Sequence, residues 1–259
     1  MMKIVRFEWQ GRASWGILEE NERIFALEGD VYGKFKEGKE ICRLEEARLL
    51  APADPRVMVA CALNYTDHAK ELGRALPKEP KLFFKPPNTL SHPLDEIAFP
   101  KASRDYRFEA ELCVVLKRRA REVSEKEALD YVLGYTCGND LGAFDFLEAD
   151  GIVTRARGFD GSGPIGPWIA TDLDPDHLSI KGRVNGEIKQ DSNTGLMISG
   201  VRKLISHVSA FMTLQPGDVI WTGTPKGGAC PVKAGDVMEV EIEGIGILKN
   251  KVASPGQAV

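Results

Sequence analysis

Apolar residues along this chain recur mostly with the two-residue period of β-strands and rarely with the period of a long helix. Alternating stretches cover 5–9, 15–18 and 24–27, and apolar or aromatic runs cover 57–63 and 81–85. Two segments, 214–225 and 232–242, share a Gly-Asp-Val turn that leads into a strand. Short helices are expected at 40–50, 66–73 and 125–133. The pattern predicts a mainly β fold with short helices (α+β), of the β-roll or folded mixed sandwich kind.

Pro52 and Pro55 divide the chain into two expected units. Residues 1–52 are predicted to form a small strand-rich N-terminal module, in which no catalytic pattern is visible. Residues 53–259 are predicted to form the larger catalytic domain. A chain of 259 residues is long enough to bury a core of that size.

The segment 107–116 is the centre of the candidate chemistry. It is predicted as a strand, and successive side chains of a strand point to opposite faces, so Glu109 and Glu111 share one face. Two adjacent carboxylates repel each other and lose hydration, and a hard divalent cation removes that penalty. The alternative is an exposed acidic face paired with nearby Arg or Lys side chains, as is common for an isolated pattern of this kind.

Other candidate groups lie on separate elements. Asp140 ends a predicted return strand at 134–140 and would supply a third acidic ligand, which leaves room for water and substrate on the metal. His68 and Glu71 lie three residues apart on one helical face, where the carboxylate would orient the imidazole as a general base. A surface ion pair has the same spacing. Lys85, at the end of the strand 81–85, is placed to contact an anionic ligand or simply to be solvated.

Composition and missing motifs narrow the functional classes. The net charge of -4, with scattered basic residues, argues against nucleic-acid and membrane-surface binding. The five cysteines contain no C-x-x-C pair, and no signal peptide or bilayer-length apolar run is visible, so a cytoplasmic protein is expected. No P-loop or G-x-S-x-G motif is present, and Pro164 rules out the helix start that a dinucleotide-binding glycine motif requires.

The ordered set of motifs resembles the fumarylacetoacetate hydrolase family over residues 55–250. The motifs that carry the resemblance are Asn64-Tyr65-x-x-His68-x-x-Glu71, Phe84-Lys85-Pro86, Glu109-x-Glu111, Asn139-Asp140, Gly166-Pro167-Trp168, Val184-Asn185-Gly186-Glu187 and Pro216-Gly217-Asp218-Val219-Ile220-x-Thr222-Gly223-Thr224-Pro225. The resemblance implies a β-roll-like fold and usually a homodimer. It also implies a Mg2+ or Mn2+ site formed by Glu109, Glu111 and Asp140, and a catalytic dyad of His68 and Glu71 on a mobile lid. The candidate substrate contacts are Lys85, Arg157 and Thr224.

Two positions refine the resemblance. Leu147 is more like the homoprotocatechuate-pathway isomerase/decarboxylase branch than the acylpyruvate hydrolases, which more often carry Gln there. The apolar side chain removes a group that would help to position a hydrolytic water. Arg157 stands where many relatives have Lys; it grips carboxylates with two N–H groups but cannot exchange protons.

These features predict a metal-dependent isomerase/decarboxylase of small anionic 2-oxo or 2-hydroxy-diene dicarboxylic acids in aromatic-compound catabolism, acting through a metal-stabilised enolate. The alternatives are a C–C hydrolase of the acylpyruvate or fumarylacetoacetate type, an oxaloacetate decarboxylase, and a non-catalytic 2-oxoacid-binding module. The length of the substrate's distal chain depends on pocket walls that the sequence does not place.

Overall fold

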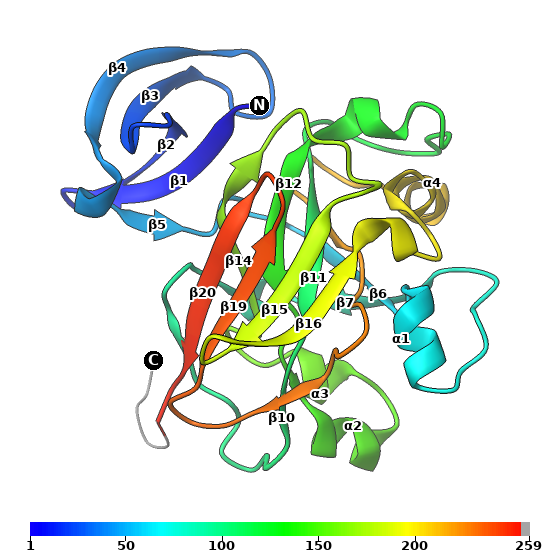
Figure 1. The fold of residues 1–259 in the computed structure, drawn as a ribbon. Coiled ribbons are helices and arrows are strands. Elements are labelled where there is room, and N and C mark those ends of the chain that lie inside the picture. The colour runs from blue at the N-terminus through cyan, green and yellow to red at the C-terminus, as the bar shows by residue number, and fades with distance from the viewer. Residues whose placement is uncertain (255–259) are drawn as a thin grey trace.

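The computed structural model describes residues 1–254, and its backbone is mostly β-strand with a few short helices (Figure 1). The largest sheet has twelve strands, which in chain order are β1 (Lys3–Trp9), β2 (Arg12–Leu18), β3 (Arg23–Gly29), β4 (Phe35–Arg43), β5 (Arg48–Leu50), β6 (Met58–Ala62), β7 (Lys81–Lys85), β8 (Leu90–Ser91), β11 (Ala110–Leu116), β12 (Val132–Asn139), β14 (Gly163–Ala170) and β17 (Val219–Trp221). They are paired in the order β4-β3-β2-β1-β14-β12-β11-β17-β6-β7, with β5 beside β1 and β8 beside β14. The prediction of a mainly β fold is confirmed.

A second sheet of five strands covers one face of the central strands (Figure 1). Its strands are β9 (Glu96–Ile97), β15 (Ser179–Val184), β16 (Glu187–Asn193), β19 (Val237–Ile242) and β20 (Gly246–Val252), in the order β16-β15-β19-β20-β9. Leu112 and Val114 of β11 share one buried cluster with Ile180 and Val240 of the facing sheet. Burying each of these side chains contributes about 1.5–3 kcal/mol, so this interior holds the two sheets together as a folded sandwich.

The N-terminal strands have a small core of their own. Val5, Phe7 and Ile24 are buried there, yet β1 also pairs with β14 through Lys3 and Ala170, so the N-terminal strands extend the large sheet. The division between residues 52 and 53 stays a prediction. The short helix expected at 40–50 is wrong, because this stretch pairs with β3 and then with β1. It contains the end of β4, a 3-10 turn at Leu44–Glu46, and β5.

The helices are short. The α-helices are α1 (Thr66–Glu71), α2 (Phe144–Asp150), α3 (Thr154–Arg157) and α4 (Val201–Phe211), and 3-10 turns also occur at Pro87–Thr89, Ala128–Tyr131 and Thr194–Leu196. Within residues 1–254 no helix has the length and apolar character needed to cross a membrane. Helix α1 matches the prediction, since Gly73 closes it with a φ of 61°.

The helix expected at 125–133 is wrong. Ser124 donates to the Glu127 carboxylate at 2.6 Å, and no side-chain cap holds the backbone N–H groups that a helix start would expose. Only the 3-10 turn at Ala128–Tyr131 forms, because Val132 already belongs to β12 and pairs with Leu116.

The strand expected over 107–116 is divided at Glu109. Its first part is β10 (Tyr106–Phe108), which joins β13 (Gly142–Ala143) and β18 (Cys230–Val232) in a separate three-stranded sheet. Its second part is β11, in the middle of the large sheet. The chain therefore changes sheets at the first of the two glutamates, which places Glu109 at a corner and Glu111 inside a strand.

The aspartates of the two Gly-Asp-Val turns differ in the number of backbone N–H groups that they bind. Asp218 is fully buried and accepts hydrogen bonds from the backbone N–H groups of Arg56, Val57 and Gln215, at 3.1, 2.9 and 2.7 Å. It thereby ties the start of β6 to β17. Asp236 accepts from one backbone N–H, that of Lys233, and from the Asn185 amide, both at 2.9 Å.

We predict that Asp218→Ala lowers the free energy of unfolding by about 3 kcal/mol, because three backbone N–H groups lose their acceptor in the interior. The matched variant Asp236→Ala should cost about 1 kcal/mol, since it releases one backbone N–H and one side-chain amide. Denaturant unfolding followed by far-UV circular dichroism measures both. Equal losses in the two variants would contradict this assignment.

Candidate active site

Three carboxylates from two neighbouring strands meet inside the protein. Glu111 lies on β11, Glu109 at the corner before it, and Asp140 directly after β12. The register that pairs Ala110 with Asn139 brings them together, and the Asp140 N–H donates to the Glu109 carbonyl at 2.9 Å. One oxygen of each carboxylate lies within 4.8 Å of the others, and no member is more than 6% exposed. We call this group the acidic triad.

Because the acidic triad is buried, ionising its carboxylates costs free energy. Burial raises the pKa of Glu111 well above its usual range, and the Asp140 and Glu109 carboxylates raise it further. Burial also raises the pKa of Glu109, although the nearby Arg157 guanidinium opposes the shift. Side chains buried to this degree do not fit the alternative of an exposed acidic face.

Two buried cations offset part of this charge. The Arg157 guanidinium lies 2.6 Å from Glu109 Oε1 and 3.2 Å from Asp140 Oδ2, and it also donates to the Asp140 carbonyl. Burial alone would lower the pKa of Arg157, but Asp140 and Glu109 raise it above its usual value. Lys85 Nζ lies 2.6 Å from Asp140 Oδ1. With all five groups ionised, three negative charges face two positive ones.

Lys85 is buried, so the alternative of a solvated lysine is wrong. Its ammonium group also donates to the carbonyls of Arg157 and Ser162, at 3.2 and 3.3 Å. Together with Asp140, these contacts occupy all three of its N–H groups. Contact between Lys85 and a substrate stays a prediction, and it would require the ammonium group to leave one of these partners.

The acidic triad fits a hard divalent cation. Such ions bind oxygens at about 2.0–2.6 Å, so two ligands of one ion can lie up to about 5 Å apart. The oxygens of the triad lie within that limit, and their net negative charge favours an ion of this class. Glu111 Oε2 accepts the Gly223 N–H at 2.8 Å, which orients this carboxylate. Glu109, Glu111 and Asp140 are the residues that would hold such an ion.

His68 and Glu71 lie on helix α1, and His68 lines the cavity that also contains the acidic triad. His68 Nδ1 and Glu71 Oε2 are 3.1 Å apart, and the Gly227 N–H donates to the same carboxylate oxygen at 3.0 Å. His68 is 7% exposed, whereas the Glu71 side chain is 33% exposed, so the pair joins a buried imidazole to a carboxylate that reaches the surface. Asp67 ties the helix down further, because it accepts from the Ser192 hydroxyl at 2.6 Å and the Lys226 N–H at 3.3 Å.

One cavity of about 260 Å3 connects these groups. The acidic triad, His68, Arg157 and Thr224 all line it. Its apolar wall comes from Leu63, Leu72, Phe83, Phe144, Leu147 and Val153. Leu147 therefore lies on the cavity wall, as its place in the family motif suggested. Thr224 donates to the Ala110 carbonyl at 3.1 Å and accepts from Gln190 at 2.8 Å.

The cavity also contains residues that sequence reasoning missed. Cys61 lines it with a pKa that burial, and then Glu111, raises to about 12, so it is no nucleophile at neutral pH. Arg74 lines it from the segment after α1. No local pattern marks either residue, since both reach the cavity only through the packing of distant strands and loops.

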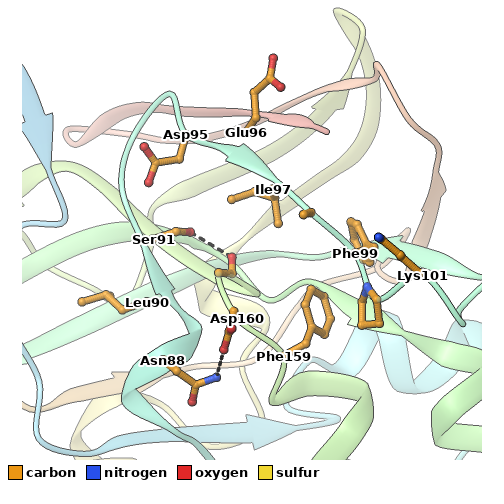
Figure 2. Close-up of a pocket in the computed structure, with 13 residues that line it drawn as sticks. Asn88, Leu90, Ser91, Asp95, Glu96, Ile97, Phe99, Lys101, Phe159 and Asp160 are labelled. Atoms are coloured by element: carbon orange, nitrogen blue, oxygen red, sulfur yellow. Dashed lines mark hydrogen bonds between the residues drawn. The ribbon is translucent and has the colours of Figure 1, made fainter. Parts of the chain in front are cut away.

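A larger cavity of about 530 Å3 lies elsewhere, between β9 and the segment 159–161 (Figure 2). Several of its polar groups have partners within the protein: Asn88 donates to Asp160 at 2.6 Å, and Ser91 donates to the Gly161 carbonyl at 2.9 Å. Asp95 accepts from the His92 N–H at 2.9 Å. The larger cavity contains neither a histidine nor the cluster of potential metal ligands that lines the smaller one, so the candidate active site is the smaller cavity.

Comparison with known proteins places the chain in a family. A family model described as fumarylacetoacetate (FAA) hydrolase, C-terminal, matches residues 57–253, and another described as Rv2993c-like, N-terminal, matches residues 2–52. The 4-hydroxyphenylacetate degradation bifunctional isomerase/decarboxylase of Salmonella dublin is 45% identical over 201 residues, which cover 75% of this chain and 46% of that relative.

Solved structures give the same result. The 2-hydroxyhepta-2,4-diene-1,7-dioate isomerase of Mycobacterium marinum has a TM-score of 0.91 at 35% identity, over 99% of this chain and 100% of that one. The fumarylacetoacetate hydrolase of Exiguobacterium antarcticum has a TM-score of 0.88 at 33% identity, over 98% and 100%. With a family model matched over residues 57–253, the chain belongs to the fumarylacetoacetate hydrolase family.

Proposed function

We propose that this protein is a divalent-metal-dependent isomerase and decarboxylase of 2-oxo or 2-hydroxy-diene dicarboxylic acids, as used in the catabolism of aromatic compounds. The observation that carries the proposal is a buried acidic triad in one cavity with a histidine that a glutamate orients. A divalent ion held by the triad would supply Lewis-acid stabilisation of negative charge that develops on a substrate oxygen.

His68 is the proposed proton-transfer group. An ionised Glu71 can only accept, so its contact with Nδ1 places a proton on that nitrogen and leaves Nε2 free to take one from substrate. The Gly227 N–H fixes the orientation of Glu71 from the other side. Glu71 thus acts through His68, and the pair moves a proton along the carbon chain of the substrate.

Arg157 is the proposed clamp for a substrate carboxylate. Its charge is permanent, and its contacts with Glu109 and Asp140 hold it beside the acidic triad. Thr224, which lines the cavity, is the proposed neutral contact. A homodimer and a cytoplasmic location remain part of the same proposal.

Leu147 favours isomerisation and decarboxylation over hydrolysis. Its apolar side chain on the cavity wall offers no group to hold a hydrolytic water. The likeness to a solved fumarylacetoacetate hydrolase supports C–C hydrolysis as the second candidate. Turnover assays with Mg2+ should detect isomerisation of 2-hydroxyhepta-2,4-diene-1,7-dioate and little cleavage of an acylpyruvate. Decarboxylation of oxaloacetate without turnover of the diene would establish an oxaloacetate decarboxylase instead. Cleavage of the acylpyruvate alone would establish the hydrolase instead.

Glu111→Gln should weaken the binding of Mg2+ or Mn2+ at least about tenfold, because it replaces a charged oxygen ligand with a neutral amide. Isothermal titration calorimetry measures the affinity. Glu96→Gln, an exposed position on β9, is the matched control and should bind the ion as the wild type does. Unchanged affinity in Glu111→Gln would remove the metal site from the proposal.

His68→Ala should lower turnover about 10²–10⁴-fold, the usual contribution of a general base, while metal affinity barely changes. Glu71→Gln should be milder, because the imidazole remains and loses only its orientation and charge. The double variant should resemble His68→Ala, since the two residues act as one unit. His207→Ala, on α4, controls for the loss of a histidine outside the cavity. Wild-type turnover in His68→Ala with both the diene and oxaloacetate would refute the role.

A further inference from the structure

Arg74 is a cation at the candidate active site whose guanidinium N–H groups are available to bind a ligand. It lines the same cavity as the acidic triad and His68, and its side chain is exposed. The other cation on the cavity wall, Arg157, is held beside the triad by Glu109 and Asp140, so the substrate carboxylate that it is proposed to clamp is the one next to the triad. Within residues 1–254, the Arg74 guanidinium has no carboxylate in ion-pair distance. A guanidinium presents a planar set of N–H donors that matches a carboxylate.

The backbone holds Arg74 in a fixed relation to helix α1. The Arg74 N–H donates to the Ala69 carbonyl at 2.9 Å, and the Gly73 N–H donates to the Lys70 carbonyl at 3.1 Å. These two bonds, with Gly73 at a φ of 61°, form a Schellman motif at the end of the helix. Arg74 is therefore fixed one residue past the glycine that ends the helix carrying His68, and any shift of that helix carries both.

The cavity wall shows what kind of molecule would reach Arg74. Apolar side chains, among them Leu72 and Phe83, line the cavity that the acidic triad and Arg74 share. Such a wall suits a hydrocarbon chain, whereas the triad with its ion and the guanidinium each suit an acidic group. A monocarboxylic ligand held at the triad would leave Arg74 without an anion.

We propose that Arg74 binds the remote carboxylate of a dicarboxylic substrate and so selects diacids over monoacids of the same length. This inference rests on the proposed function, and it names the residue that reads the far end of the substrate. It also gives the remote carboxylate a positioning role. Helix α1 is already held by hydrogen bonds of Glu71 with the Gly227 N–H and of Asp67 with the Ser192 hydroxyl. A contact between the substrate and Arg74 would add a further interaction with this helix, and so favour the position of His68 beside the substrate.

Calorimetry with Mg2+ and three probes tests the inference. The probes are oxalate, which is too short to extend beyond the triad, and the matched pair 2-oxoheptanedioate and 2-oxoheptanoate. Wild-type protein should bind the diacid about tenfold more tightly than the monoacid, as expected for one charge-assisted contact. Arg74→Met should bring this ratio close to 1, and Arg74→Lys should keep part of it. Lys78→Met removes an exposed cation from the same segment, outside the cavity, and should keep the wild-type ratio.

The probes separate the two ways in which the account can fail. Normal oxalate binding with equal affinity for the diacid and the monoacid would overturn the role of Arg74 and leave the triad in place. A wild-type ratio retained in Arg74→Met would overturn it in the same way. Failure of the wild-type protein to bind oxalate with Mg2+ would refute the proposed function, and the inference about Arg74 with it.

Discussion

Mutual repulsion among three buried carboxylates is the interaction around which this chain is arranged. Their oxygens lie within 4.8 Å of one another where water offers little screening, so each ionised group raises the free energy of the others. This repulsion is partly offset by Arg157, Lys85 and the Gly223 N–H, which contact the carboxylates and come from three separate parts of the sequence. These contacts leave an excess of negative charge. A divalent cation bound among the three carboxylates would remove that excess.

The packing that brings the acidic triad together also places the other candidate catalytic and binding groups beside it. The chain changes sheets at Glu109, which turns β10 away and opens a cavity beside the corner. Helix α1 contributes His68 to the wall of that cavity and is held by hydrogen bonds from the backbone of Lys226 and Gly227. In the account proposed here, proton transfer by His68 and recognition of a remote carboxylate by Arg74 both depend on this one short helix. Proton transfer and substrate selection would therefore both change if this helix moved.

Local patterns in the sequence predicted the strands and the paired glutamates, because the two-residue period of a strand sets which side chains share a face. They failed where tertiary pairing decides the structure: 40–50 is drawn into strands by β3 and β1, and 125–133 is cut short by β12. The family resemblance indicated His68, Glu71 and Asp140 together, although Asp140 is far from the other two in sequence. It gave no signal for the burial of Lys85 beneath Asp140 or for Arg74, since both depend on the depth and walls of a cavity.

The central claim is that Glu109, Glu111 and Asp140 bind one divalent ion that also binds substrate oxygens. A crystal soaked with Mn2+ and oxalate, an enolate mimic, tests it most directly through the anomalous signal of manganese. The account predicts one strong anomalous peak among the three carboxylates, at about 2.0–2.6 Å from an oxygen of each, as hard-cation coordination requires, with oxalate bound to the same ion. A triad without a peak, with Arg157 still paired to Glu109 and oxalate bound elsewhere, would contradict it.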